Sequence, residues 1–176
     1  MTGKTFFNHL ANGRMDIVQL LLSLLEQTHA AYCLIGGLAV NAYAEPVVSL
    51  DLDLVVIADR LDALRQAAVA KGLMVREFEH SVNLTAPGSD LRIQIQADPR
   101  YQDFLTRAVG QTVLGYSMNV AALEDVLRGK LWAYADPTRR KSKRQKDLAD
   151  ILRLVETHPQ LKSMLPPEII RQVETP

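Results

Sequence analysis

Two aspartates in an otherwise apolar segment, residues 32–56, constrain the fold of this chain most. The segment YCLIGGLAVNAYAEPVVSLDLDLVV has an apolar run, two adjacent glycines, a short helical stretch that ends before Pro46, and a second apolar run with Asp51 and Asp53. The two apolar runs predict buried strands joined by a short helix. Carboxylates are costly to place among leucine and valine unless their charge is compensated, so the two aspartates indicate a site.

The second expected strand places both carboxylates on one face. Side chains of a strand alternate between faces, so Ser49, Asp51 and Asp53 share one face and the leucines between them share the other. The two carboxylates are then about 7 Å apart along the strand. A divalent cation is the simplest way to relieve their repulsion, and hard oxygen ligands suit Mg²⁺. We therefore expect Asp51 and Asp53 to be metal ligands.

Gly36 and Gly37 stand where the first strand meets the helix. Glycine lets the backbone approach a ligand closely, and the first N–H groups of a helix are free to bind phosphate. Each pattern has a structural alternative, because the glycines could form only a tight turn and the aspartates could lie at an exposed edge. Together they indicate a phosphate site beside a metal site, as transfer from a Mg²⁺-bound triphosphate requires.

Hydrophobic periodicity predicts an α/β fold with a mixed sheet and a helical C-terminal part. Strands are expected at 31–36, 47–57, 73–80, 82–86 and 91–96, with one or two further strand pieces within 112–121. Helices are expected at 15–28, 37–44, 60–72, 99–108, 123–136 and 143–158. We expect residues 1–120 to form the α/β core and residues 121–176 a helical region packed on it, in a single compact unit.

Charge and cysteine content narrow the functional classes. The chain of 176 residues has 20 basic and 20 acidic side chains, so only local clusters can indicate attraction to nucleic acid or membranes. The lone Cys33 cannot form an internal disulfide, which favours a reducing compartment. The N-terminus lacks the apolar core of a signal peptide, and the longest apolar stretch, 17–26, is too short to span a bilayer. We expect a soluble, cytoplasmic protein with no membrane partner.

A basic segment covers the start of the last long expected helix. Six of the eight residues in RRKSKRQK, 139–146, are basic. Arg139, Arg140 and Lys143 are candidates to neutralise a triphosphate or to contact an RNA acceptor, since phosphate contact needs no base recognition. The alternative is a solvated helix face balanced by nearby acids.

Lys130 and Asp147 lie on two successive expected helices and would meet if these helices pair antiparallel. Asp150 shares the helix face of Asp147, because residues three apart are neighbours on a helix. One interpretation is an interhelical salt bridge. The other is that Lys130 reaches a phosphate while Asp147 orients it.

The segment IGGLAVNAYAEPVVSLDLDLVV resembles the first motif of the DNA polymerase β-like nucleotidyltransferase superfamily: an apolar strand, Gly-Gly or Gly-Ser, a helix, and D-x-D on the next strand. The segment LEDVLRGKLWAYADPTRRKSKRQKDLADILRL is similar to the lysine helix and K-D-x-x-D helix of the abortive-infection toxin branch (AbiEii/AbiGii-like), whose members are paired with antitoxins. By matching position, the resemblance implies that Gly36 and Gly37 contact the triphosphate and that Asp51 and Asp53 hold Mg²⁺. It also implies that Lys130 and Asp147 complete the site.

The chain departs from the pattern of that superfamily in two places. Many relatives carry R-x-T-x-D-x-D, and Val47 and Ser49 stand where the arginine and threonine would be. The third acid of the superfamily lies on a later strand, where the best match in LRIQIQ is Gln94, an amide that cannot act as a base. Asp98 could substitute only if the chain bends back.

We therefore expect a nucleotidyltransferase fold that uses Mg²⁺ to move a nucleoside monophosphate from a triphosphate to a hydroxyl acceptor. Asp51 and Asp53 would hold the metal, and Ser49 would join the two glycines in binding phosphate. The resemblance suggests an RNA or protein acceptor, with tRNA first, and an antitoxin as partner; a small molecule such as an aminoglycoside is the remaining option. The rival hypothesis, supported by Gln94, is a catalytically degenerate member that binds a nucleotide or a partner protein.

Overall fold

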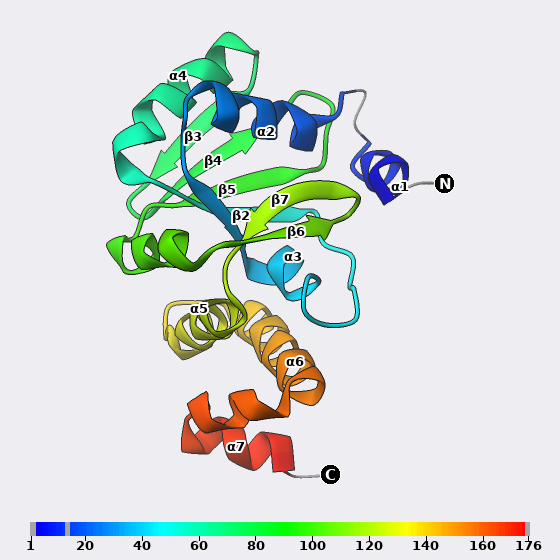
Figure 1. Ribbon diagram of the computed structural model, residues 1–176, viewed down its shortest axis with the longest axis vertical. Coiled ribbons are helices and arrows are strands. Elements are labelled where there is room, and N and C mark those ends of the chain that lie inside the picture. The colour runs from blue at the N-terminus through cyan, green and yellow to red at the C-terminus, as the bar shows by residue number, and fades with distance from the viewer. Residues whose placement is uncertain (1–2, 13–14, 175–176) are drawn as a thin grey trace.

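A computed structural model of the protein describes residues 3–12 and 15–174. In this part of the chain, seven strands form one sheet in the order β3-β4-β5-β2-β1-β7-β6 (Figure 1). The β2–β5 and β1–β7 pairs are parallel, and the other neighbours are antiparallel. Helices lie on both sides of the sheet, which confirms the expected α/β fold with a mixed sheet flanked by helices (Figure 1).

The bounds of the elements follow the expected alternation closely. The strands are β1 (Tyr32–Ile35), β2 (Asp51–Val56), β3 (Met74–Phe78), β4 (Ser81–Thr85), β5 (Arg92–Gln96), β6 (Val109–Val113) and β7 (Tyr116–Val120). The helices are α1 (Gly3–Leu10), α2 (Ile17–Gln27), α3 (Gly36–Val40), α4 (Leu61–Ala70), α5 (Leu123–Ala135), α6 (Lys141–Thr157) and α7 (Pro167–Glu174), with 3-10 helices at Ala58–Arg60, Pro99–Arg107 and Pro159–Met164. None of the described helices is both long and apolar enough to cross a bilayer.

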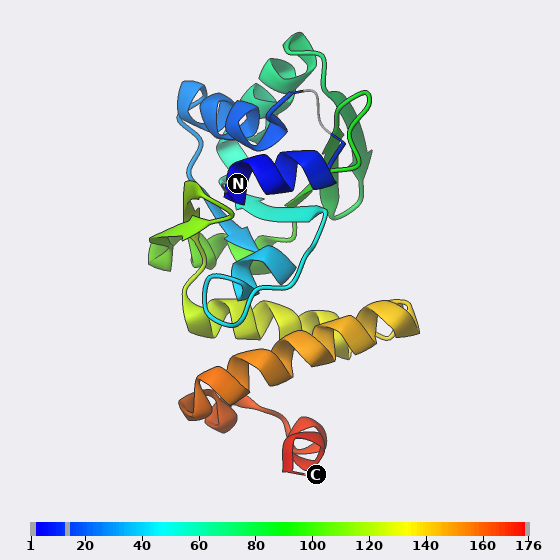
Figure 2. The same cartoon turned by 90° about the vertical axis from the view of Figure 1, so that its right-hand side faces the viewer.

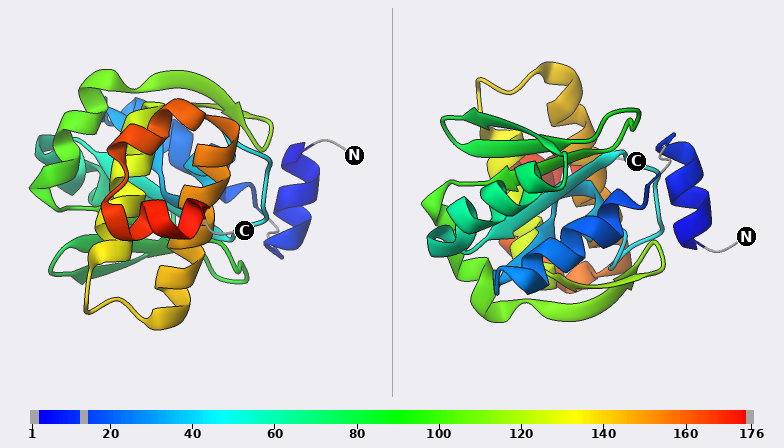
Figure 3. Two further views of the ribbon diagram at one scale, coloured as in Figure 1. Left: turned by 90° about the horizontal axis from the view of Figure 1, so that it is seen from below. Right: turned by 90° about the horizontal axis from the view of Figure 1, so that it is seen from above.

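Helix α2 covers one face of the sheet with an apolar stripe. The Asp16 side chain caps the helix by accepting a hydrogen bond from the backbone N–H of Gln19 (2.9 Å). Leu21, Leu24 and Leu25 recur at helical spacing and are each 1 % exposed. Seen from above, α2 and α4 lie next to each other across this face (Figure 3).

Strand β2 lies inside the sheet between β1 and β5 and separates the core from a polar face. Leu52 and Leu54 are buried on one side, while Asp51 and Asp53 point to the other side and are only half-buried. Helices α3, α5 and α6 lie on the side opposite to α2 and α4 (Figure 1). The alternation along β2 therefore directs both carboxylates toward α3, α5 and α6.

The helices after the last strand close that side of the molecule. Helices α5 and α6 lie against each other and run in opposite directions, and α7 follows beyond α6 (Figure 2). Leu127 of α5 and Ile151 of α6 are completely buried in the core. The antiparallel pairing brings the basic start of α6 back over the polar face of the sheet.

Helices α1 and α7 and the start of β2 differ from the elements expected from the sequence. Helix α1 was not expected, because its eight residues are anchored by one buried side chain, that of Phe7. The strand expected at 47–57 begins only at Asp51. The side chain of Asn41 donates to the carbonyl of Val47 (2.8 Å) and accepts from its N–H (3.0 Å), so the backbone of Val47 is bound outside the sheet.

Candidate active site

The two carboxylates of β2 line one pocket. Strand β2 pairs with β1, which ends just before Gly36. This confirms that the two aspartates lie on the strand next to β1 and that their side chains share one face of it. The cavity has a volume of about 280 Å³. Its lining has five basic and three acidic side chains among Gly37, Ser49, Asp51, Asp53, Asn83, Arg92, Gln94, Lys130, Arg139, Lys143, Lys146 and Asp147. A lining with excess positive charge around two aspartates suits a polyanion accompanied by a cation.

Gly36 is required where β1 turns into α3. Its φ of +70° is in the left-handed region, and a Cβ atom at this position would collide with Oδ2 of Asp53. Gly37 has no such constraint, because a Cβ there would lie 3.8 Å from Oδ2 of Asp150 and 3.9 Å from Oγ of Ser49. The sequence therefore places glycine where the backbone has to approach the carboxylate of Asp53.

Asp53 is an acid of the pocket without a direct partner among the described residues. Burial raises the pKa of its carboxyl group to about 6. The positive charge of Lys130 opposes this rise, and the negative charge of nearby Asp51 adds to it. Its carboxylate makes no hydrogen bond and no ion pair with the described residues. A carboxylate in this situation favours either a proton or a cation.

Asp51 has partners on both carboxylate oxygens. Oδ1 lies 2.8 Å from Nη2 of Arg92 on β5, and Oδ2 lies 3.4 Å from Nζ of Lys143 on α6. Arg92 reaches Asp51 because the parallel register of β2 and β5 sets these residues opposite each other. Arg92 was missed from the sequence, because its role depends on a strand register that no local pattern encodes.

Amide side chains continue the row of Asp53 across the sheet. The register sets Gln94 of β5 beside Asp53 and Asn83 of β4 beside Gln94. Gln94 therefore lies next to the two aspartates, at the position where the superfamily pattern would have a third acid. Asp98 is bound elsewhere: it accepts hydrogen bonds from the side chain and backbone of Arg100, and the side-chain bond holds the pKa of its carboxyl below the usual value.

Lys130 forms a buried ionic cluster between α5 and α6. Its Nζ lies 3.1 Å from Oδ1 of Asp147 and 2.6 Å from Oδ2 of Asp150. Arg139 also binds Asp147 (2.6 Å), and Arg153 binds Asp150 (2.8 Å). The interhelical salt bridge considered from the sequence is thus present, and both Lys130 and Asp147 also line the pocket.

The other residues expected at the site divide into two groups. Arg139 and Lys143 line the pocket, and so does Ser49, which is 8 % exposed and accepts a hydrogen bond from the N–H of Asp51 (3.3 Å). Gly36 lines an adjoining cavity of about 100 Å³ that shares Asp53 with the pocket. Arg140 is exposed and does not contribute to the lining of either cavity.

The oxygen donors of the pocket fit Mg²⁺. Besides the two carboxylates, Gln94 and Asn83 offer amide oxygens, and Oδ1 of Asn83 is buried without a hydrogen-bond partner. Among the described residues, no group of three or more His, Cys, Asp or Glu side chains could hold a metal ion. The donor set is therefore two carboxylates supplemented by neutral oxygens, all of the hard type that Mg²⁺ prefers.

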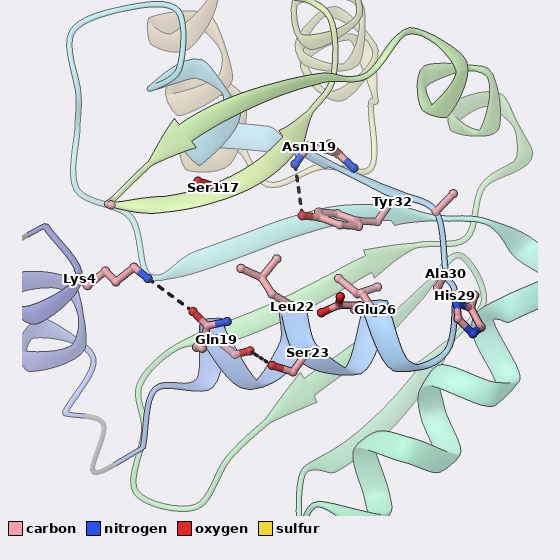
Figure 4. Close-up of a pocket in the computed structure, with 13 residues that line it drawn as sticks. Lys4, Gln19, Leu22, Ser23, Glu26, His29, Ala30, Tyr32, Ser117 and Asn119 are labelled. Atoms are coloured by element: carbon pink, nitrogen blue, oxygen red, sulfur yellow. Dashed lines mark hydrogen bonds between the residues drawn. The ribbon is translucent and has the colours of Figure 1, made fainter.

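A larger hollow of about 740 Å³ lies away from these carboxylates, between α2 and strands β1 and β7 (Figure 4). Some of its polar groups bind one another: the hydroxyl of Tyr32 accepts a hydrogen bond from the backbone N–H of Asn119 (3.2 Å), and Lys4 donates to Gln19 (3.4 Å). It is wide open and has no pair of carboxylates, so the smaller pocket at Asp51 and Asp53 is the candidate active site.

The sequence matches the model of a known family. A family model described as nucleotidyl transferase AbiEii toxin, type IV TA system, matches residues 19–174. None of the curated proteins matches the chain.

Solved structures show the same fold at low sequence identity. The antibiotic-resistance factor ANT(2'')-Ia has a TM-score of 0.58 and 13 % identity, covering 89 % of this chain and 86 % of that chain. An antigenic nucleotidyltransferase-like protein from Paracoccidioides brasiliensis has a TM-score of 0.54 and 18 % identity, covering 84 % and 89 %. The lincosamide antibiotic adenylyltransferase LnuA has a TM-score of 0.53 and 12 % identity, covering 76 % and 93 %. At these identities the likeness concerns the fold alone.

Proposed function

Because the chain belongs to the family of AbiEii nucleotidyl transferase toxins, we propose that it uses Mg²⁺ to move a nucleoside monophosphate from a nucleoside triphosphate to a hydroxyl acceptor. Asp51 and Asp53 would hold the metal. The observation that supports this most is the carboxylate of Asp53, which forms no ion pair or hydrogen bond with the described residues and whose pKa is raised by burial. A cation held by Asp51 and Asp53 would compensate both charges.

The remaining residues of the pocket fit the steps of this transfer. Bound Mg²⁺ would offset the charge of the triphosphate and favour attack on the α-phosphorus. Gly37 leaves the backbone open to a phosphate, and Arg139 and Lys143 neutralise phosphate oxygens. The acceptor oxygen forms a bond to the α-phosphorus, the bond from that phosphorus to the oxygen bridging to the β-phosphate breaks, and pyrophosphate leaves with the electron pair.

Besides the two proposed metal ligands, the pocket lining in the described part of the chain has one carboxylate, that of Asp147. Lys130 and Arg139 bind it, so it is not a free base for the proton of the acceptor hydroxyl. Gln94 can orient the hydroxyl through a hydrogen bond, but an amide does not take up a proton. Asp98 is held by Arg100. In this proposal the proton passes to water, and transfer is slow for that reason.

The acceptor proposed first is RNA, with tRNA as the first candidate and an antitoxin as the partner that controls the activity. Arg140 and Lys146, both exposed, extend the positive charge from the pocket along the start of α6, where phosphates of a polynucleotide could bind. A small-molecule acceptor is the competing option. The adenylyltransferase LnuA was solved with lincomycin bound, and it shares the fold of this chain.

Transfer of label tests the proposal directly. The protein is incubated with each α-³²P-labelled nucleoside triphosphate, Mg²⁺ and total RNA, and label on RNA and released pyrophosphate are measured. We expect one triphosphate to label RNA and Asp53→Asn to abolish the labelling, while the exposed Asp59→Asn serves as a matched control. A parallel arm with aminoglycosides and lincosamides identifies a small-molecule acceptor. If no triphosphate releases pyrophosphate with any acceptor, the protein is not a transferase under these conditions.

The second candidate is a degenerate module that binds a nucleotide without transferring it. The amide of Gln94 beside Asp53 is the observation that favours it, because this position lacks a group that accepts a proton. Calorimetric binding of a triphosphate that remains intact over hours, with no label on any acceptor, is the expected result for such a module.

A further inference from the structure

The two carboxylates proposed to hold the metal differ in their partners. Both oxygens of Asp51 contact cations, Arg92 from β5 and Lys143 from α6, whereas Asp53 has no partner among the described residues. A divalent cation that binds between the two aspartates must therefore compete with Arg92 and Lys143 for the same oxygens. The pair Arg92 and Lys143 is called the Asp51 clamp below.

The clamp differs in burial from the other ionic cluster of the pocket. The side chains of Lys130 and Asp147 are 8 % and 2 % exposed, as suits a fixed link between two helices. The side chains of Arg92 and Lys143 are 65 % and 36 % exposed. Ion pairs at such exposed positions are weak and exchange partners readily, because water and other ions replace them at small cost.

The clamp also lies where a triphosphate would bind. Arg92 and Lys143 line the same pocket as Gly37 and Asp53, and they come from two elements on different sides of Asp51. The segment from Val47 to Leu50, which leads into β2, contributes no cation. The charges nearest to Asp51 are therefore carried by two flexible side chains that can turn from a carboxylate to a phosphate.

We propose that Arg92 and Lys143 are exchangeable cations of the active site. In the metal-free protein they neutralise Asp51; when Mg²⁺ binds Asp51, they are released and bind oxygens of the triphosphate. This inference rests on the proposed function. It predicts that metal alone binds weakly and that metal and nucleotide strengthen each other's binding, because each removes an obstacle to the other.

Binding measurements without catalysis test the exchange. Mn²⁺ affinity is measured by electron paramagnetic resonance without nucleotide, and the affinity for a triphosphate analogue with a methylene group between its α- and β-phosphorus atoms is measured by calorimetry with saturating Mg²⁺. Arg92→Gln and Lys143→Gln should each bind Mn²⁺ alone roughly 2- to 5-fold more tightly, as expected for loss of an exposed competing ion pair. The same variants should bind the analogue about tenfold more weakly, because a charged phosphate contact is lost. The opposite signs distinguish exchange from a purely structural role.

Matched controls separate the clamp from a general change in charge. Lys146→Gln removes a cation from the lining of the same pocket, but Lys146 makes no ion pair among the described residues, so Mn²⁺ affinity should change much less. Arg76→Gln removes an exposed arginine on β3 outside the pocket and should change neither affinity. Arg92→Lys keeps the charge and should restore most of the wild-type values.

The outcomes also separate this inference from the proposed function. If Mn²⁺ binds wild type, Arg92→Gln and Lys143→Gln equally, or if Lys146→Gln tightens Mn²⁺ binding as much as Lys143→Gln does, the exchange is wrong and the metal site stands. If neither the wild type nor the Arg92→Gln, Lys143→Gln double variant binds Mn²⁺ at millimolar concentration, the metal site of the proposed function is itself wrong.

Discussion

At Asp53, the stability of the fold and the proposed metal binding oppose each other. Burial raises its pKa in the folded protein from 3.8 to about 6, so the folded state holds the proton more tightly than the unfolded chain does. Stability from this group is complete below about pH 4, falls as the pH rises to about 6, and stays lower above it. In the proposed function a proton and the metal would compete for this carboxylate, so metal binding should weaken as the pH falls below about 6.

Replacing this carboxylate by an amide should therefore stabilise the metal-free protein at neutral pH. We expect Asp53→Asn to raise the free energy of unfolding by between about 1 and 3 kcal/mol at pH 7.5, or the unfolding temperature by a few degrees, with no gain at pH 4. Circular dichroism melts in EDTA at the two pH values measure this, with the exposed Asp59→Asn as the control. A large loss of stability at both pH values would mean that Asp53 supports the fold.

The two adjacent glycines should respond differently to the same substitution. Gly36→Ala puts a methyl group against Oδ2 of Asp53 and forces alanine to a φ of +70°, so we expect a loss of about 1–3 kcal/mol together with weaker Mn²⁺ binding. Gly37→Ala has room for the methyl group and should be neutral or slightly stabilising. Urea unfolding and Mn²⁺ titration of the two variants give the comparison. Equal effects at both positions would show that the close approach at Gly36 does not matter.

At the scale of elements, helices α5 and α6 are joined by the buried ionic cluster around Lys130. The contribution of this cluster to stability can be measured separately from any contribution to ligand binding. Lys130→Met leaves Asp147 and Asp150 buried with one cation fewer, so we expect the free energy of unfolding to fall by about 3 kcal/mol. The control is Arg128→Met on the same helix, because buried Asp125 keeps Arg107 as its partner. A Lys130→Met protein of wild-type stability that no longer binds a triphosphate would instead assign Lys130 to the phosphate site.

Elements with a strong local signal could be predicted from the sequence, and those that depend on a distant contact could not. The apolar stripe of α2 and the alternation of Asp51 and Asp53 with leucines are visible in single segments. The start of β2 cannot be predicted from a single segment, because the side chain of Asn41 binds the backbone of Val47 and keeps it out of the sheet. Helix α1 is short and depends on one buried contact, so its periodicity is weak.

At the scale of the whole molecule, the candidate active site is assembled from six elements, α3, β2, β4, β5, α5 and α6. Glycines from α3 and aspartates from β2 could be predicted together, because they share one continuous motif. The contribution of β5 could be predicted only in part: Gln94 was found as a departure from a family pattern, whereas Arg92 depends on the register between two strands. The ion pair of Lys143 with Asp51 depends on the direction of α6 over the sheet, which hydrophobic periodicity does not encode.

Whether these parts catalyse transfer depends on the amide beside Asp53. Gln94→Glu adds a third carboxylate beside Asp51 and Asp53, the proposed metal ligands, so we expect tighter Mn²⁺ binding. The new carboxylate can also take the proton of the acceptor, and a positioned base accelerates transfer by roughly 10²-fold at the lower end. The labelled-triphosphate assay at matched Mg²⁺ measures this, with Gln96→Glu, two residues further along β5, as a control for added charge.

The result distinguishes a slow enzyme from a binding module. A slow enzyme gains both metal affinity and turnover in Gln94→Glu, because the rest of its site is already in place. A degenerate module gains metal affinity without turnover, because no acceptor hydroxyl is held near the α-phosphorus. If the wild type is already fast and Gln94→Glu is slower, Gln94 does not occupy the position of a missing base. Asp98 would then be tested first, and it could act only if Arg100 releases it.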